Sequence, residues 1–200
     1  MPRQHRAAVA VTLHLRARRV PLAVAASVGG AALIWALWLT LAKERDAILL
    51  IVVLTIVLMV SVLSTTLAAP DEDLERTASL RWPWRRALHL LAALALVLVV
   101  LLATVPTDAR FGPAALVLRD TAGLLGLTAL CASVVGAARA WFLPLGWTVV
   151  AALFPQSSTW GALATWQGQP HTSRPAAVVA AVLAVAGLLT YAFLGSARRD

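Results

Sequence analysis

Six long stretches that are almost free of charged residues divide this 200-residue chain, and they constrain its fold more than any other feature. The hydrocarbon core of a bilayer is about 30 Å thick, so a helix needs about 20 apolar residues to cross it. The chain is 60% hydrophobic and 13% charged, whereas soluble domains carry about 25% charged residues. The pattern predicts an all-α, polytopic protein: one transmembrane domain with six membrane spans, at about residues 21–42, 47–69, 87–105, 116–138, 140–155 and 176–195.

The basic residues are unevenly divided between the two sides of this six-span arrangement. Of the 17 Lys and Arg residues, 12 fall on the side that holds both termini. Because basic residues in short loops favour the cytoplasmic side, the distribution predicts cytoplasmic termini and a multi-pass protein of the plasma membrane. The basic clusters alternate with apolar runs instead of sharing one folded face, which argues against nucleic-acid binding. The first span is too long for a signal-peptide h-region and is predicted to be an anchor.

Five arginines precede or adjoin the start of the first span. We interpret this tail as a short amphipathic helix on the inner leaflet, where its arginines would contact anionic headgroups. The alternative interpretation is a disordered basic tail that only sets the topology. The arginines concerned are Arg3, Arg6, Arg16, Arg18 and Arg19.

The loop between the second and third spans carries the pattern of a short charged helix at about residues 71–81. It opens with three acidic residues, which favour a helix N-terminus by interacting with its dipole. Glu72 and Arg76 are spaced for an i, i+4 ion pair, and the run Trp82-Pro83-Trp84 is expected to end the helix. A helix tied to two spans in this way has the geometry to transmit a push from a soluble partner. The alternative is a solvated turn without a partner.

An uncharged segment at about residues 156–170 separates the last two spans. One of the hydroxyl residues at 157–159 can cap a helix of two to three turns there. Because no charge interrupts it, this segment can dip into the outer leaflet as an interfacial or re-entrant element and act as an outer gate. The alternative is a loop that is merely anchored by its tryptophans. The residues expected on its apolar side are Trp160, Leu163 and Trp166.

Arg119 and Asp120 place two charges inside the fourth span. One arginine at the bilayer centre costs about 2.5–3.5 kcal/mol on insertion scales, so charges inside a span are retained for a reason. The six residues before Arg119 supply only about 9 Å of helix, a depth at which the side chain can reach the interface. We therefore expect a membrane ion pair with a topological or structural role; the alternative role is contact with a substrate.

Small residues also repeat at four-residue intervals along the fourth span. Such spacing allows helix backbones to approach closely, and it predicts that this span lies at a helix–helix interface. The residues concerned are Ala122 and Gly126, followed by Ala132, Gly136 and Ala140.

The sequence lacks the common motifs for catalysis and energy conversion. The single lysine, Lys43, is not preceded by the glycines of a phosphate-binding loop, and the four histidines are never spaced i, i+4. All nine acidic residues lie at or near the ends of spans, whereas a proton-driven carrier needs carboxylates at mid-span. These features predict a protein that is not an enzyme, with no catalytic residue, cofactor or metal of its own.

The architecture resembles the membrane subunits of type-2 ATP-binding-cassette (ABC) exporters. The shared features are six spans, a basic element before the first, a helical cytoplasmic loop between the second and third, and an outer segment before the sixth. At the residue level, three stretches look like those of small permeases of high-GC Gram-positive bacteria: Pro70–Ala78, Leu118–Leu127 and Trp141–Leu145.

The resemblance implies a division of labour between subunits. The loop helix would be the coupling helix that docks into a separate ATPase subunit, which would bind ATP and Mg²⁺. Two permease chains, identical or different, would pair around an export path lined by spans one, two and five. The alternative is an accessory or scaffolding subunit with no path. The residues assigned to the ATPase interface are Asp71, Glu72, Asp73, Leu74, Glu75, Arg76, Ala78 and Ser79.

Overall fold

The structure, a computed structural model, describes residues 19–42, 47–68, 82–154 and 158–197, and these residues form helices joined by short connections without any strand. The predicted coupling helix at 71–81 and the tail before residue 19 lie outside the described ranges. The elements are α2 (Val20–Leu41), α3 (Leu49–Ser64), η1 (Thr65–Leu67), α5 (Trp82–Leu102), α6 (Ala114–Val135), η2 (Ala137–Arg139), α7 (Phe142–Leu153), α8 (Thr159–Ala164), η3 (Trp166–Gly168) and α9 (Arg174–Leu194).

Five helices of the described chain are long and apolar enough to cross a membrane, with mean hydropathies between 1.5 and 2.6. They are α2, α3 with η1, α5, α6 and α9. Five such helices indicate a multi-pass membrane protein. The predicted fifth span corresponds to α7, which has only 12 residues; with η2 it forms a shorter apolar segment, Ala137–Leu153.

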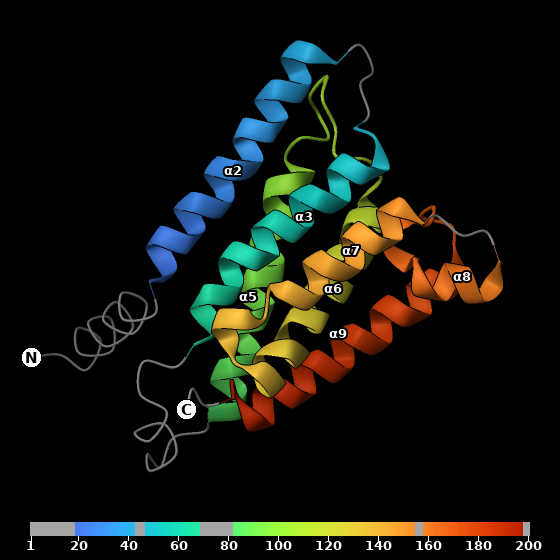
Figure 1. Ribbon diagram of the computed structural model, residues 1–200. Coiled ribbons are helices and arrows are strands. Elements are labelled where there is room, and N and C mark those ends of the chain that lie inside the picture. The colour runs from blue at the N-terminus through green and yellow to red at the C-terminus, as the bar shows by residue number, and fades with distance from the viewer. Residues whose placement is uncertain (1–18, 43–46, 69–81, 155–157, 198–200) are drawn as a thin grey trace, which may run out of the picture.

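Helices α2, α3, α5 and α6 run in alternating directions through one bundle (Figure 1). Helix α9 runs in the same direction as α6, because the shorter α7 lies between them in the chain. Helix α2 begins, α3 ends, α5 begins and α9 ends at the same end of the bundle, which we call the terminal end. The connection between α5 and α6 and the helix α8 lie at the opposite, distal end (Figure 1). The alternation follows from the short connections, which force neighbouring helices to be antiparallel.

The closest contact in the bundle is the crossing of α6 and α9. A Cβ atom added to Gly187 would overlap the backbone of Gly126, and one added to Gly126 would overlap the backbone at Leu183 and Ala184. Two glycines therefore let the helix backbones touch, as small residues do at membrane helix interfaces. The prediction that the fourth span lies at a helix interface is confirmed.

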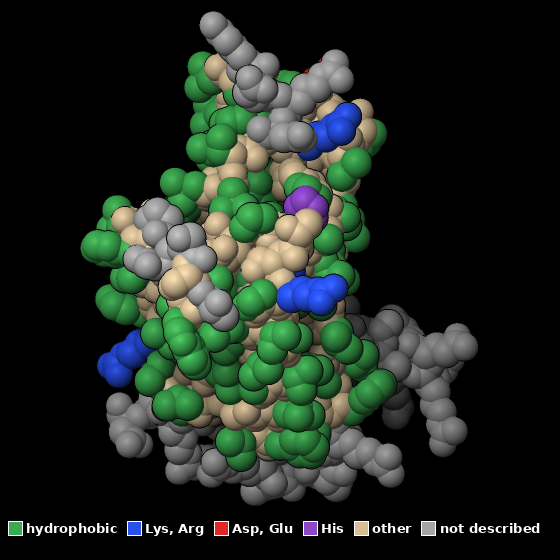
Figure 2. All heavy atoms as spheres, turned by 90° about the vertical axis from the view of Figure 1, so that its right-hand side faces the viewer, with side chains coloured by type: hydrophobic (Ala, Val, Ile, Leu, Met, Phe, Trp, Pro, Cys, Tyr) green, Lys and Arg blue, Asp and Glu red, His purple; other side chains and the backbone are tan. Residues whose placement is uncertain are grey.

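The outward side of the bundle is apolar. In Figure 2 hydrophobic side chains cover most of the described part of the face that carries α8 and α9. On α9 a row of large apolar side chains at helical spacing is half exposed or more. These residues are Val178, Val182, Val185, Leu189 and Phe193. In water, a protein with a surface of this kind would aggregate, whereas lipid tails solvate such a surface at no cost.

A proline lies in the first turn of α5. The run Trp82-Pro83-Trp84 forms the first turn of α5, so this helix begins five residues before the predicted span start at 87. The helix that the run is predicted to end lies outside the described ranges. Proline lacks an N–H that the first turn leaves unpaired in any helix, so it fits this position well. Arg85 and Arg86 consequently belong to the helix itself.

Candidate functional site

Hydrogen bonds at the terminal end fix the two points between which residues 69–81 run. The Tyr191 hydroxyl of α9 donates to the Leu67 carbonyl oxygen at the end of η1, at 2.9 Å. The Thr66 hydroxyl lies 2.8 Å from His89 Nε2 of α5. The ends of α3–η1, α5 and α9 are thus joined, and both anchors of the 69–81 connection belong to one packed unit.

Gly195, which follows α9, lies at the same end of the bundle and contacts α5. It ends α9 with a φ of 78°, a conformation that residues with a Cβ rarely adopt. The guanidinium of Arg86 lies against it, where an added Cβ would overlap the side chain. The C-terminal carbonyl groups of a helix carry partial negative charge, so a cation from α5 is well placed at this helix end.

Among the described residues, arginines gather at the terminal end. Within the described ranges the only acidic residues are Asp108 and Asp120, both toward the distal end, whereas the described residues of the terminal end include four arginines. These arginines are Arg19, Arg85, Arg86 and Arg139. Of the predicted inner-leaflet arginines only Arg19 is described; it is exposed and directly precedes α2.

Arg119 and Asp120 form the expected ion pair, and the pair is buried in the protein. Arg119 Nε donates to Asp120 Oδ1 at 2.7 Å, and the two side chains are 6% and 0% exposed. The two remaining nitrogens of the guanidinium donate to backbone oxygens 50 residues away, Nη1 to Pro170 and Nη2 to Gln169, each at 2.8 Å. The pair therefore ties α6 to the segment that leads into α9. The expectation that the Arg119 side chain reaches the membrane interface is wrong, because these backbone oxygens hold its guanidinium inside the protein.

The distal segment between α7 and α9 begins with the predicted capped helix. Ser158 is the cap, because its side-chain oxygen accepts a 3.1 Å hydrogen bond from the Gly161 N–H. Helix α8 has six residues, shorter than the two to three turns expected, and the 3₁₀ turn η3 follows it. The short helix ends because Thr165 leaves helical geometry and its hydroxyl bonds back to the Gly161 oxygen at 2.9 Å.

The three residues proposed for an outer gate do not share one side of this segment. Trp160 is 82% exposed, Leu163 is partly buried and Trp166 is completely buried. Trp166 belongs to η3, where its ring covers Gly123 of α6 so closely that a Cβ there would overlap it. The expectation of a common apolar side is wrong, because one helical projection cannot be continued past the end of α8.

Uncharged polar side chains complete the attachment of the distal segment. Trp147 Nε1 of α7 donates to the Ala164 oxygen at 2.6 Å. Gln167 Nε2 donates to Thr148 Oγ1 at 3.4 Å, and both of these side chains are buried. Sequence reasoning missed these residues because neutral side chains give no charge signal; for Trp147 and Thr148 the only available sign was their polarity inside a predicted span.

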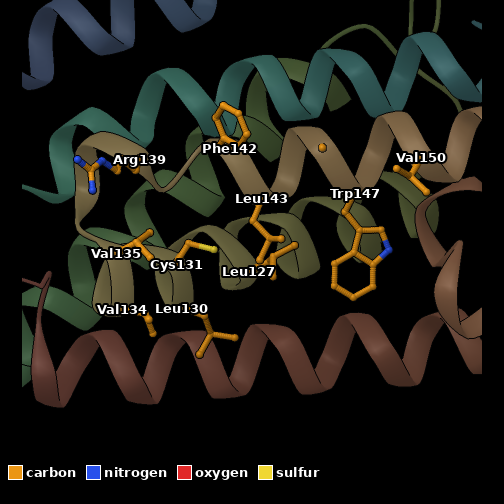
Figure 3. A pocket seen from close by; sticks show the side chains of 11 residues that line it. Leu127, Leu130, Cys131, Val134, Val135, Arg139, Phe142, Leu143, Trp147 and Val150 are labelled. Atoms are coloured by element: carbon orange, nitrogen blue, oxygen red, sulfur yellow. The ribbon is translucent and has the colours of Figure 1, made fainter.

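A large apolar groove lies between α6 and α7 (Figure 3). Its volume is about 1080 Å³, it is open on one side, and Arg139 is its only charged lining residue. Sequence reasoning did not find it, because it depends on how far the short α7 stands from α6. The lining residues are Leu127, Leu130, Cys131, Val134, Val135, Arg139, Phe142, Leu143, Gly146, Trp147 and Val150.

The part of the chain that the structure describes brings no three His, Cys, Asp or Glu residues together in a geometry that could hold a metal ion. Its chemistry is that of packing, charge distribution and hydrogen bonding. Comparison with protein-family models, with curated proteins and with solved structures found no match to this chain.

Proposed function

We propose that this protein is the membrane subunit of an ABC exporter, a permease that works as a dimer and takes its energy from separate ATPase subunits. In this proposal the chain is not an enzyme and binds neither ATP nor Mg²⁺ itself. The proposal rests on the resemblance of the sequence and is supported by the geometry of the terminal end.

The single observation that carries the proposal is the joined base of the 69–81 connection. Tyr191 and His89 link the end of α3–η1 to α9 and α5. A force applied to residues 71–79 by a partner would therefore reach three long helices together, which is what energy coupling requires. The partner must bind with different free energy to the two states of the permease, since otherwise it shifts no equilibrium.

The six-span topology belongs to the same proposal. Residues 137–153 consist of the 3₁₀ turn η2, a two-residue turn and α7. The 12 residues of α7 make about 18 Å of helix at 1.5 Å per residue, and in this proposal the whole apolar segment forms the sixth crossing of a hydrocarbon core of about 30 Å. With this sixth crossing both termini fall on one side, and the excess of arginine makes that side cytoplasmic. The resulting protein is a plasma-membrane protein with both termini inside.

At the distal end the proposal assigns gating to the exposed part of the outer segment. Trp160 and Leu163 remain candidates because they lie on α8, of which Trp160 is exposed. Trp166 is held against α6 and serves as the anchor of the segment. In this proposal α8 moves relative to the Arg119–Asp120 pair.

The test is ATP hydrolysis by the complex purified through a tag on this chain in mild detergent. We expect the wild-type chain to bring down a nucleotide-hydrolysing subunit. Exchanging the charges of the loop with Glu75→Arg and Arg76→Glu should reduce the co-purified ATPase activity about tenfold or more, since like charges placed at an interface cost several kcal/mol. Arg110→Gln, at the distal end, is the matched control and should leave the activity unchanged.

Two outcomes would overturn the proposal. Purification of a stable protein without any nucleotide-hydrolysing partner would favour the accessory or scaffolding subunit instead. Equal ATPase recovery with the double charge exchange and with Arg110→Gln would remove residues 71–79 from the interface.

A further inference from the structure

The groove between α6 and α7 has the shape of a site that opens sideways into the membrane. Helix α7 supplies Phe142 and Val150 along its length, and α6 supplies Val134 and Val135 on the opposite wall. These four side chains are between 50% and 73% exposed. A surface so apolar and so exposed, in a protein built of membrane-spanning helices, faces hydrocarbon.

The groove spans about one leaflet in depth. From Phe142 to Val150 the helix rises about 12 Å, somewhat less than half of a hydrocarbon core of about 30 Å. Arg139 lies at one end of the row of lining residues and Val150 at the other (Figure 3). Because Arg139 follows α6 at the terminal end, the groove runs from that surface toward the middle of the bilayer.

The terminal mouth of the groove is built for a negative group. Arg139 is exposed, and its guanidinium takes part in no ion pair or hydrogen bond within the described ranges. It ends η2, three residues before the start of α7, whose N–H groups at Phe142 and Leu143 and helix dipole also favour an anion. No carboxylate of the described chain lies at this end to neutralise it.

Aromatic residues place this mouth at the level of the lipid headgroups. Trp141 and Phe142 lie next to it with ring centroids 5.1 Å apart, and Trp141 Nε1 donates to the Ala138 oxygen. Tryptophans with a paired N–H and an exposed ring are typical of the membrane–water interface. A charged headgroup and an apolar chain can therefore be bound by one continuous site.

We propose that this groove binds an anionic phospholipid of the leaflet at the terminal end, with one acyl chain between α6 and α7 and the phosphate at Arg139. The volume of about 1080 Å³ lies just above the range of small-molecule sites, about 300–1,000 Å³. Arginine binds phosphate through a bidentate fork, which favours this headgroup over a zwitterionic one that presents a cation as well. The inference is independent of the transport proposal, because it requires no ATPase.

The test measures lipid retained by the full-length protein in mild detergent, by native mass spectrometry, after incubation with phosphatidylglycerol or phosphatidylcholine of identical acyl chains. We expect one phosphatidylglycerol to be retained per chain. Arg139→Gln should lower its affinity about fivefold, as expected for one arginine at an anionic surface, whereas Arg139→Lys should retain most of it.

Gly146→Leu tests the apolar half of the site. A Cβ added to Gly146 meets no atom within 4 Å, so leucine can fill the groove without disturbing the fold. We expect this variant to lose most of the retained phosphatidylglycerol. Gly29→Leu, at a position of α2 that is equally open, and Arg110→Gln at the distal end are the matched controls and should bind as the wild type does.

A second measurement needs no variant, because the single cysteine of the chain, Cys131, lines the groove. An acyl chain in the groove should slow its reaction with N-ethylmaleimide in phosphatidylglycerol vesicles relative to phosphatidylcholine vesicles. Equal retention of both lipids, or unchanged binding by Gly146→Leu, would overturn the proposal. The proposal would also be overturned if Gly146→Leu converted a dimer to monomers and left lipid binding intact. The groove would then be an interface between two copies of the chain.

Discussion

Helices α6 and α2 illustrate two opposite uses of an apolar helix in one bundle. Helix α6 has the lowest mean hydropathy of the five long helices, 1.5, and yet it is the most buried; α2 has a value of 2.0 and is mostly exposed. Helix α6 contacts α9, α3, α5 and α7, whereas α2 packs mainly on α3 and stands at the edge of the bundle (Figure 1).

The difference teaches that polarity, and not hydrophobicity, identifies the interior of this protein. In water the least polar helix would be the most buried, but lipid tails are as apolar as leucine and exert no such sorting. Buried polar groups instead find partners within the protein, as Arg119 does at Asp120, Gln169 and Pro170. The α2 surface needs only to be compatible with lipid.

The largest effect should come from removing the cation of α6. Arg119→Leu leaves the buried carboxylate of Asp120 without its partner and frees two backbone oxygens, which should cost about 3–5 kcal/mol of stability. Thermal unfolding in detergent measures it. Arg110→Leu, an exposed arginine at the same end, is the control. Adding Asp120→Leu should restore part of the lost stability, because removing both partners costs less than leaving one charge buried without its partner. If Arg119→Leu destabilises the protein no more than Arg110→Leu does, Arg119 does not stabilise the contact between α6 and the segment before α9.

A smaller effect should follow from widening the α6–α9 crossing. Gly187→Leu forces a side chain into the Gly126 backbone and should destabilise the protein by about 1–3 kcal/mol, the usual range for an overfilled core. Gly29→Leu makes the same change on α2, where a Cβ meets nothing within 4 Å, and should stay within about 0.5 kcal/mol of the wild type. Equal melting temperatures for the two variants would contradict the difference in packing between the α6–α9 crossing and the exposed surface of α2.

The smallest effect should come from deleting one hydroxyl group. Tyr191→Phe removes the bond to the Leu67 oxygen and should cost about 0.5–1.5 kcal/mol. Thr40→Val on α2 removes a hydroxyl that bonds only to oxygens of its own helix, at Ala36 and Leu37, and should cost less. Hydrogen exchange of the α3–η1 amides is a second measurement, with faster exchange expected in the Tyr191 variant alone.

Features that depend on local sequence were predictable. Long apolar runs became helices because a membrane helix satisfies all its backbone groups internally. Gly126 marked an interface because only small residues permit such an approach, and the Arg119–Asp120 pair followed from two adjacent charges in an apolar run. The cap at Ser158 followed from a hydroxyl residue before a helix-compatible stretch.

Features that depend on tertiary contacts were not predictable from the sequence. The partners of Arg119 at Gln169 and Pro170 lie 50 residues away, and no local pattern indicates them. Trp160 and Trp166 look equivalent in the sequence, but a break after α8 sends one outward and the other into the core. Pro83 is compatible with the end of one helix and with the start of the next, and the structure places it in the first turn of α5.

The α6–α9 crossing gives the molecule a rigid lever. Near the distal end α6 holds the segment that leads into α9 through Arg119, and near the terminal end α9 holds the end of η1 through Tyr191. Since the two rods touch backbone to backbone at Gly126 and Gly187, there is no soft layer of side chains between them to absorb a displacement. A tilt of the α6–α9 pair that is imposed at one end must therefore displace the contacts at the other end.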